Sequence, residues 1–487
     1  MKHPHATRYE EVAAHYRVAI EKGVFGSNGR LPSLRTIMKA HAVSLSTAVQ
    51  ACRQLEAEGL VESRERSGSY VSQRQHRTAA QVAESSLCRS MPPASAEGAL
   101  RPLELFMRSR HRTVQVDFGA ATCAPWLYPA EPLRRLSRSV LQDEPDILAS
   151  PASASGCPLL RQVIARRAVS RGIQVTPDEV VITSGCSEAL ALALRAVTQP
   201  GDTVMVESPT YYGFLHLISA LGATPVEMPT SVREGLSLEA VEFALSRGTR
   251  ISAIVCMPTL HNPLGSTMPP AARQALVRLC EQHDIALIED DVYADMHPEI
   301  ERLKALKAWD RQGQVIYCSS FNKTLSPGLR LGWLLGGRWH EAIEHLKMAT
   351  GKPKEDLPQR VAARFLSVGS AYERHLKRFQ VELRHQRRAT RDALESFMPE
   401  GTCVHEPPGG MHLWVQLPAG VSSMQLFLRA LDNHIRVVPG ALFSESRFGD
   451  GFLRISCGWP LDAGRRAALR TVGELARLPT DGHRSRS

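Results

Sequence analysis

From residue 114 onward, short apolar runs alternate with longer amphipathic stretches, and this rhythm constrains the fold more than any other feature of the sequence. The apolar runs, each bounded by turn residues, are residues 180–183, 203–206, 251–257, 285–289 and 315–319. Between them lie stretches with helical spacing, such as 188–197 and 270–281. Strands that alternate with helices in this way pair in parallel and are buried on both faces. The sequence therefore predicts an α/β domain with a mainly parallel sheet that helices cover on both sides.

The rest of the chain has different patterns. Residues from about 371 to 478 have longer helical segments and fewer strands, which predicts a smaller α+β lobe. Residues 76–113 are rich in Pro and Arg and have little periodicity, so we expect a linker with at most a short helix near 103–107. The expected domains are thus 1–75 and 114–478, with a short tail at 479–487.

The N-terminal region contains three helical segments followed by two short apolar runs. Residues 9–22 carry apolar side chains at helical spacing, and a second helix is expected from residues 32–33 to about 41. Ser44 is a residue type that caps helices, and a third helix should begin there. The runs at 60–63 and 68–71 predict two strands joined by a turn.

Three helices and a hairpin in this order are typical of a winged helix-turn-helix, which places its third helix in the major groove of DNA. Such helices also occur as plain packing units, so topology alone leaves both interpretations open. In a DNA-binding unit, hydroxyl side chains at the start of the third helix would approach phosphates and bases, and nearby arginines would hold the backbone. The candidate DNA-binding residues, including those of the wing, are Arg30, Arg35, Ser44, Ser46, Thr47, Arg64, Arg66 and Gly68.

This region resembles the GntR family of bacterial regulators. The resemblance rests on the order and spacing of Arg30-Leu31-Pro32-Ser33-Leu34-Arg35, Val43-Ser44, Leu55-Glu56-Ala57-Glu58-Gly59-Leu60 and Gly68-Ser69-Tyr70-Val71. It implies that the unit binds DNA as a regulator of transcription. Many family members carry a basic residue where this chain has Leu45, and a leucine side chain cannot form a hydrogen bond with a base edge.

Three motifs in the larger domain each allow a functional and an ordinary interpretation. Gly185, Cys186 and Ser187 lie where a strand turns into a helix, whose free N–H groups would bind a phosphate, although such turns are more often only structural. Tyr211, close to a proline, would stack on a flat ring or simply belong to the core. Asn262 precedes a proline and either offers its amide or forms a turn.

Two further motifs supply charged groups. Three consecutive carboxylates, with Asp290 in the middle, close an apolar strand, where one of them would pair with a pyridinium nitrogen. A metal site is the competing interpretation, but histidines at suitable spacing are missing from the sequence nearby. Lys323 follows a buried strand, where it can lose its proton and attack an aldehyde, although most lysines are solvated surface charges. Ser320 and Arg330 would add a hydroxyl and a guanidinium to a phosphate site.

Taken in order, the five motifs resemble those of fold-type I pyridoxal 5'-phosphate (PLP) enzymes of the class I/II aminotransferase family, over roughly residues 114–478. The resemblance implies that Lys323 forms an internal aldimine with PLP, that Asp290 pairs with the pyridine nitrogen and that Tyr211 stacks on the ring. It also implies that Asn262 and Tyr293 contact the ring hydroxyl oxygen. The residues implied to hold the phosphate are Gly185, Cys186, Ser187, Ser320 and Arg330.

Ligand recognition adds one match and one departure. Arg454 corresponds to the arginine that grips a substrate α-carboxylate, a task that suits the forked guanidinium group. Relatives usually carry a tyrosine about five residues before Gly156 that reaches the cofactor of the neighbouring subunit, and this chain has Pro151 there. We expect the residues that choose the ligand in loops around 123–128 and 409–412.

A GntR-like reader followed by an aminotransferase-like domain is the architecture of MocR-type regulators. The resemblance implies a homodimer, swapped head to tail, that binds two DNA half-sites and changes state when PLP or its adduct with an amino compound binds. A transcription regulator with a PLP-dependent sensor is the first hypothesis. A working aminotransferase whose DNA-binding domain is secondary is the second. A structural partner without cofactor is the third, and the presence of Lys323 argues against it.

Composition agrees with a DNA-binding protein of the cytoplasm. The formal net charge is +10 and the pI is about 9.2, which suits a polyanionic partner. The ten cysteines lack metal-binding spacing and indicate reduced thiols. The N-terminus lacks an apolar signal core, and the sequence has no run of about 18 apolar residues.

Overall fold

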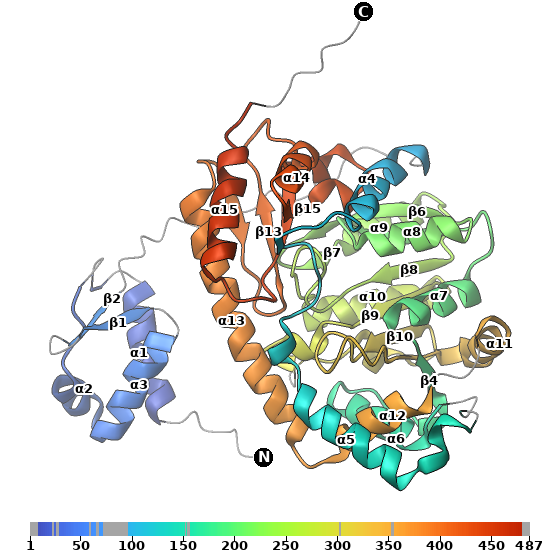
Figure 1. The fold of residues 1–487 in the computed structure, drawn as a ribbon, viewed down its shortest axis with the longest axis horizontal. Coiled ribbons are helices and arrows are strands. Elements are labelled where there is room, and N and C mark those ends of the chain that lie inside the picture. The colour runs from blue at the N-terminus through green and yellow to red at the C-terminus, as the bar shows by residue number, and fades with distance from the viewer. Residues whose placement is uncertain are drawn as a thin grey trace, which may run out of the picture. The chain divides into compact units, whose positions relative to one another are not determined.

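The computed structural model describes residues 8–21, 24–25, 29–57, 60–64, 68–71, 96–150, 152, 156–300, 303–351 and 355–479. The chain divides into two compact units, Met1–Ala80 and Gln81–Ser487 (Figure 1). Arg66 and Pro151, two positions that the sequence singled out, lie outside the described residues, as does the side chain of Arg64. Each unit has a hydrophobic core of its own.

The smaller unit consists of three helices and a β-hairpin: α1 (Arg8–Glu21), α2 (Leu34–His41), α3 (Leu45–Ala57), β1 (Val61–Arg64) and β2 (Gly68–Val71). The two strands pair antiparallel. The segment before α2 lies along β2, where the Leu31 N–H donates to the Ser69 carbonyl at 2.9 Å. Side chains from all three helices, among them Tyr16, Ile37 and Leu55, fill the core. The predicted winged helix-turn-helix is therefore confirmed.

A mixed eight-stranded sheet forms the centre of the larger unit, with the strand order β4-β11-β10-β9-β8-β5-β6-β7. These strands are β4 (Val180–Thr183), β5 (Thr203–Ser208), β6 (Thr224–Ser231), β7 (Gly235–Leu236), β8 (Ala253–Cys256), β9 (Ala286–Asp290), β10 (Val315–Ser320) and β11 (Gly332–Leu335). The five strands from β10 to β6 run parallel, and β11 and β7 run antiparallel to their neighbours. The predicted mainly parallel sheet is confirmed.

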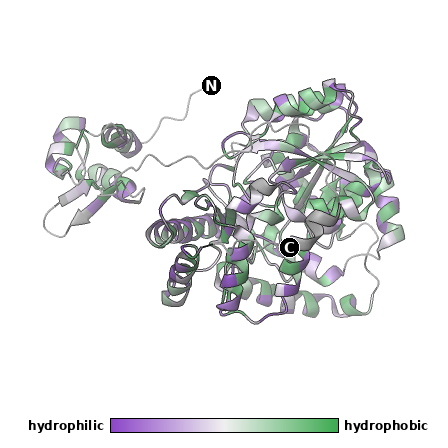
Figure 2. Ribbon diagram, turned by 90° about the horizontal axis from the view of Figure 1, so that it is seen from above, coloured by the Kyte–Doolittle hydropathy of each residue, from purple (hydrophilic) through white to green (hydrophobic). Residues whose placement is uncertain are grey.

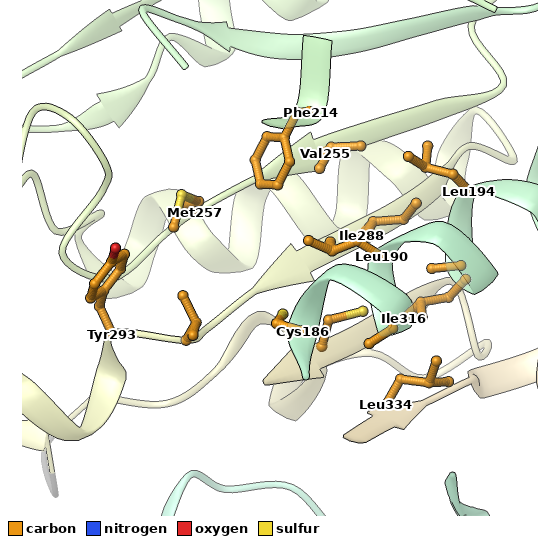
Figure 3. Close-up of a cluster of buried hydrophobic side chains, with 14 of the residues drawn as sticks. Cys186, Leu190, Leu194, Phe214, Val255, Met257, Ile288, Tyr293, Ile316 and Leu334 are labelled. Atoms are coloured by element: carbon orange, nitrogen blue, oxygen red, sulfur yellow. The ribbon is translucent and has the colours of Figure 1, made fainter. Parts of the chain in front are cut away.

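Helices cover both faces of this sheet. One face packs against α7 (Cys186–Val197), α8 (Tyr212–Ala220) and α11 (His340–Thr350). The other packs against α5 (Ala130–Asp143), α6 (Pro158–Ser170), α9 (Leu238–Ser246), α10 (Pro270–Gln282) and α12 (Asp356–Ser367). Successive strand residues alternate between the faces, since Val204 and Val206 belong to the first core and Met205 to the second. Figure 3 shows part of the first core, with Leu190 and Leu194 of α7 against Ile288 and Ile316.

A smaller lobe is built around a four-stranded antiparallel sheet of order β12-β13-β16-β15. Its elements are β12 (Cys403–His405), β13 (His412–Gln416), α14 (Ser423–Asp432), β14 (Ile435–Arg436), β15 (Val438–Pro439), β16 (Phe452–Ser456) and α15 (Ala463–Leu475), while β3 (Val116–Asp117) pairs with β14. The 27-residue helix α13 (Ala371–Phe397) joins the two parts, because Phe379 lies in the core of the large sheet and Leu394 in that of the lobe. The outer helices carry hydrophobic and hydrophilic residues on different sides (Figure 2).

Helix α4 (Ala96–Ser109) lies within the segment that the sequence places in the linker. Its Phe106 is buried against Tyr212 and Phe427, with ring centroids at 6.0 and 5.9 Å. This helix is therefore a packed part of the larger unit. The nine cysteines among the described residues are free, and none of the helices in the described ranges is long and apolar enough to cross a membrane.

Candidate ligand site and nucleic-acid interface

The candidate ligand residues gather where the central strands of the large sheet end and the small lobe begins. Asp290 ends β9, Ser320 ends β10 and Asn262 follows β8, whereas Arg454 comes from β16 of the small lobe. The carboxyl ends of parallel strands form a common crevice, which is where ligands bind in sheets of this kind. The contacts described below bring these residues together around Lys323.

The turn into α7 leaves no room for a side chain at Gly185, which has φ of 91°. A Cβ atom there would lie 2.7 Å from the Asn322 side-chain nitrogen. Arg330 is exposed and donates to the Ser184 carbonyl at 3.1 Å, and the buried Ser320 hydroxyl has no partner among the described residues. Three kinds of donor are thus found near this turn: the first N–H groups of α7, the unpaired Ser320 hydroxyl and the Arg330 guanidinium. Together they fit an anion such as phosphate.

Asp290 is 3% exposed and contacts Cys186, the first residue of α7 after this turn. Its Oδ1 accepts hydrogen bonds from the Val292 N–H at 3.2 Å and from the Cys186 thiol at 3.4 Å. Burial raises the pKa of the carboxyl group to about 7. The side chain of Cys186 therefore contacts Asp290, and only its backbone N–H is available to an anion at the turn. Ser187, the next residue, is exposed.

The three consecutive carboxylates point to three different partners. Glu289 accepts the N–H groups of Leu306 and Lys307 at 2.9 and 3.0 Å, which ties the following loop to the sheet. Asp291 pairs with Arg171 at 2.8 Å. Asp290 alone faces the ligand residues. No cluster of three or more potential metal-binding side chains occurs within the described residues, and the divergence of the carboxylates explains why these three do not form one.

Lys323 points to the centre of the site. Its Nζ donates to the Ala121 carbonyl at 2.8 Å and lies 5.6 Å from the centre of the Tyr293 ring. Burial and the neighbouring charge of Arg454 lower the pKa of the amine to about 8. A larger fraction of this lysine is unprotonated near neutral pH than of a solvated one, which makes it a better nucleophile for an aldehyde.

Helix α13 fixes the residue next to this lysine. The Thr324 hydroxyl lies 2.7 Å from that of Tyr372, and its carbonyl oxygen lies 2.6 Å from His375 Nε2. The motifs did not reveal these supports, because Tyr372 and His375 come from the helix that links the two lobes. Neither did they reveal the Ala121 carbonyl that accepts from Lys323.

Arg454 connects the small lobe to the large sheet. The residue is 1% exposed, and its guanidinium donates to Asn262 Oδ1 at 3.0 Å and to the Gly119 carbonyl at 2.7 Å. Asn262 therefore holds the arginine in place in this structure. The Nε atom of Arg454 has no partner among the described residues, so the guanidinium is not saturated by the protein.

Tyr293 and Tyr211 supply the aromatic groups. The Tyr293 hydroxyl lies 3.3 Å from His412 Nε2, and Tyr211 packs beside Phe214 with ring centroids at 5.6 Å. Burial raises the pKa of both tyrosines, so both hydroxyls keep their protons. His412 lies in one of the two loops expected to choose the ligand, but no motif assigned it a contact with Tyr293.

Several candidate DNA-binding residues that the structure describes in the smaller unit are exposed to solvent. The Ser44 hydroxyl caps α3 by accepting the Thr47 N–H at 3.2 Å, and it lies 2.8 Å from the Ser46 hydroxyl. Arg30 and Arg35 are exposed on the preceding loop and on α2. The hydroxyls of Ser44 and Ser46 lie at a helix N-terminus, where the helix dipole favours phosphate. Leu45, the first residue of α3, is 54% exposed.

Two family models match the chain. The model described as bacterial regulatory proteins of the gntR family matches residues 8–71, and that of aminotransferase class I and II matches residues 136–469. The chain belongs to the class I and II aminotransferase family. It carries a GntR-family DNA-binding domain at its N-terminus, and the predicted fusion of the two domains is confirmed.

Relatives with both domains are named as regulators. The uncharacterized HTH-type transcriptional regulator YjiR of Escherichia coli is 35% identical, with 96% of this chain and 98% of the relative aligned. The regulator TauR of Rhodobacter capsulatus is 28% identical over 88% of this chain and 87% of its own length. Relatives that match both domains of this GntR–aminotransferase fusion over most of their length are thus named as transcriptional regulators.

Solved structures resemble the larger unit. Kynurenine aminotransferase of Pyrococcus horikoshii, in complex with PMP, has a TM-score of 0.70 and 29% identity, and the match covers 77% of this chain and 93% of that one. LysN, the α-aminoadipate aminotransferase of Thermus thermophilus, complexed with N-(5'-phosphopyridoxyl)-L-leucine, has a TM-score of 0.70 and 27% identity, with 79% and 97% covered. The predicted fold class is confirmed.

Proposed function

We propose that this GntR–aminotransferase fusion binds PLP at Lys323 and uses it to sense an amino compound, while the smaller unit binds operator DNA. One observation carries the proposal. Lys323, with its pKa lowered to about 8, lies close enough to the buried Asp290 and to the carboxylate-binding candidate Arg454 for both charges to act on it. A charged lysine, an acid and an arginine are costly to enclose without a ligand that uses all three.

The candidate ligand residues fit PLP group by group. The unpaired Ser320 hydroxyl, Arg330 and the N-terminus of α7 would hold the phosphate. Asp290 would accept a hydrogen bond from the protonated pyridine nitrogen, and the positive charge of that ring would lower the pKa of the carboxyl group and keep it ionised. The Nζ atom of Lys323 would bond to the aldehyde carbon of PLP. When bound, PLP supplies an aldehyde that combines reversibly with primary amines.

Recognition of the amino compound would fall to the small lobe. Arg454 offers a forked pair of N–H groups, the arrangement that binds a carboxylate at two points. Its present partners, Asn262 and the Gly119 carbonyl, hold the guanidinium in position without neutralising its charge. We therefore infer that the effector is an amine with a carboxylate. The protein would respond by a state-dependent affinity for this effector.

On the DNA side, Arg30 and Arg35 would contact phosphates, with Ser46 and Thr47 near the bases. A MocR-type homodimer, swapped head to tail, would present two such surfaces to two half-sites, and a reduced, basic protein of this kind would act in the cytoplasm. The formal net charge of +10 would strengthen this binding at low salt.

The visible spectrum of the purified protein tests the ligand half of the proposal. PLP held by a lysine absorbs in the visible range, so a band should form with wild-type protein and shift when amino acids are titrated in. Binding to DNA from the protein's own promoter region, at low salt and with and without PLP, tests the other half. A protein that takes up no PLP, or that ignores this DNA under both conditions, would contradict the corresponding half.

A working aminotransferase is the second candidate, because Lys323, Asp290, Arg330 and Arg454 are all present. Cofactor binding alone requires most of this set, so its presence does not establish turnover. Single-turnover experiments with a panel of amino acids separate the two. Conversion of the bound cofactor to pyridoxamine phosphate would support an enzyme, and its absence with a bound ligand would support a sensor.

A further inference from the structure

One face of the small-lobe sheet directs His412 as well as Arg454 toward the candidate ligand residues of the large sheet. In the antiparallel pair β13–β16, His412 lies opposite Ser456, and Trp414 lies opposite Arg454. Alternate residues of paired strands share a face, so the side chains of His412 and Arg454 project to the same side. Arg454 reaches Asn262 from this face and His412 reaches Tyr293, so both meet the large domain at the ligand site.

His412 is enclosed but incompletely bonded. It is 6% exposed, and its Nε2 lies 3.3 Å from the Tyr293 hydroxyl with the rings edge to face. Burial and the charges of Arg454 and Lys323 hold its pKa well below the usual range, so the imidazole is neutral. A neutral imidazole has one donor and one acceptor nitrogen, and Nδ1 has no hydrogen-bond partner among the described residues.

Packing alone does not account for a histidine here. The neighbouring residues Leu413, Trp414 and Val415 are buried in the lobe core, and a purely apolar aromatic side chain would fill the position without an unpaired nitrogen. Within the described residues, the one hydrogen bond of the ring goes to the hydroxyl of Tyr293, the group that would contact the ring oxygen of PLP.

We propose that His412 is a positioning residue that donates its Nε2–H to the Tyr293 oxygen and so leaves the tyrosine's own proton for the ring oxygen of PLP. A phenol has a single proton, and a histidine that accepted it would take it away from the ligand. The inference rests on the proposed function, since it concerns how this chain holds PLP. The titratable and charged groups that act on Tyr293 include Arg454, Tyr211, Asp290 and Tyr212, and those that act on His412 include Arg454 and Lys323.

The proposal predicts the direction of a spectroscopic shift. A hydrogen bond donated to the ring oxygen stabilises its negative charge and favours the deprotonated form of the bound cofactor. In His412→Phe the Tyr293 hydroxyl loses its donor and becomes a weaker, less fixed donor itself. The midpoint of the absorbance change with pH, measured on PLP-loaded protein, should therefore rise by about half to one pH unit.

Two further variants make this test specific. His412→Gln keeps an amide N–H near the place of Nε2 and should restore a midpoint close to that of the wild type. In a Tyr293→Phe background, His412→Phe should add no further shift, because His412 acts through the tyrosine hydroxyl. A wild-type midpoint in His412→Phe, an equal shift in His412→Gln, or an additional shift in the double variant would each overturn the proposal.

The controls separate this inference from the function on which it rests. Uptake of PLP by the wild-type protein is measured first, and its failure would refute the proposed function itself. Normal wild-type uptake with an unshifted His412→Phe would refute only the role of His412. Thermal unfolding of the unliganded variants tests the alternative of a packing residue, since a merely structural histidine would change the melting temperature without moving the pH midpoint.

Discussion

The two units place their functional residues in opposite environments. In the smaller unit, Ser44 and Ser46 are exposed and bonded to each other, on a surface that exists before any DNA arrives. In the larger unit, Ser320 and His412 are buried, and each keeps a polar atom without a partner among the described residues. Water satisfies exposed hydroxyls at little cost, whereas each unpaired buried group costs about 1–3 kcal/mol. A ligand that pairs with the Ser320 hydroxyl should thus stabilise the larger unit, and PLP should leave the stability of the smaller one unchanged.

The largest effect is expected at Lys323. Replacing it with alanine removes the only atom that the proposal connects covalently to PLP, so the visible band should vanish entirely. The exposed Lys377 of α13 offers a matched control, and Lys377→Ala should keep the band. A band of normal strength in Lys323→Ala would show that another group captures the cofactor.

A substitution in the core of the smaller unit should affect DNA binding without affecting PLP binding. Leu55 is fully buried between the three helices, and Leu55→Ala should cost about 2–5 kcal/mol, much of the stability of so small a domain. DNA binding should be lost at physiological temperature while the PLP spectrum stays as in the wild type. Val18→Ala, at a position 47% exposed on α1, should affect neither. Loss of the spectrum together with DNA binding would mean that the two units do not fold independently.

Asp290 should show opposite effects on ligand affinity and on stability. Asp290→Asn removes the charge that pairs with the pyridinium, and PLP should bind about 10–100-fold more weakly, roughly 1.4–2.7 kcal/mol. Because burial raises the pKa of Asp290 to about 7, the folded state favours the protonated acid, and the wild-type unliganded protein loses stability as pH rises toward and through 7. The unliganded Asp290→Asn variant should therefore have a higher melting temperature than the wild type at pH 8. At pH 4 the two melting temperatures should be nearly the same.

The pH dependence of PLP uptake follows from the same site. Asp290 must be ionised and Lys323 neutral, and their pKa values lie at about 7 and about 8. Wild-type PLP uptake should fall as pH drops from 8.5 to 6. In the Asp290→Asn variant, only the pH dependence that comes from the protonation of Lys323 should remain. Equal uptake across this range would exclude both groups from the binding step.

The smallest effect is expected on the DNA surface, at Leu45. An exposed leucine at the start of a recognition helix can contact a thymine methyl group but cannot form a hydrogen bond with a base. Leu45→Ala should weaken operator binding about 3–10-fold. Uracil lacks the methyl group of thymine. When operator thymines are replaced by uracil one at a time, one replacement should weaken wild-type binding as much as Leu45→Ala does, and it should leave binding by the Leu45→Ala variant unaffected. An unchanged affinity of Leu45→Ala would place this side chain away from the bases.

Local patterns were sufficient to predict most of the fold. The strand at 180–183 was found at its observed bounds because strands covered on both faces are continuous apolar runs. The start of α3 was found because Ser44 caps it, as the hydrogen bond to the Thr47 N–H shows. Helix α4 was placed in a linker, since Pro102 lies inside it and its apolar contacts are with distant residues.

The site was predictable where motifs carry backbone geometry and less so where distant side chains meet. Lys323, Asp290 and Arg454 converge because strand ends and the small lobe share one edge of the sheet. Three contacts in the site join residues that are 48 to 119 positions apart in the sequence. They are Cys186 with Asp290, Thr324 with Tyr372, and His412 with Tyr293. Such contacts depend on how helices and lobes pack, which no local pattern records.

The position of Arg454 on β16 has a consequence for the making of the protein. Ribosomes add residues from the N-terminus, and the smaller unit has its last strand once Val71 is added. The proposed ligand site lacks Arg454 until about 380 residues later, a delay of roughly 20–80 s at about 5–20 residues per second. The order of the units along the chain is therefore also an order in time, and each new molecule has its DNA-binding unit well before its ligand site.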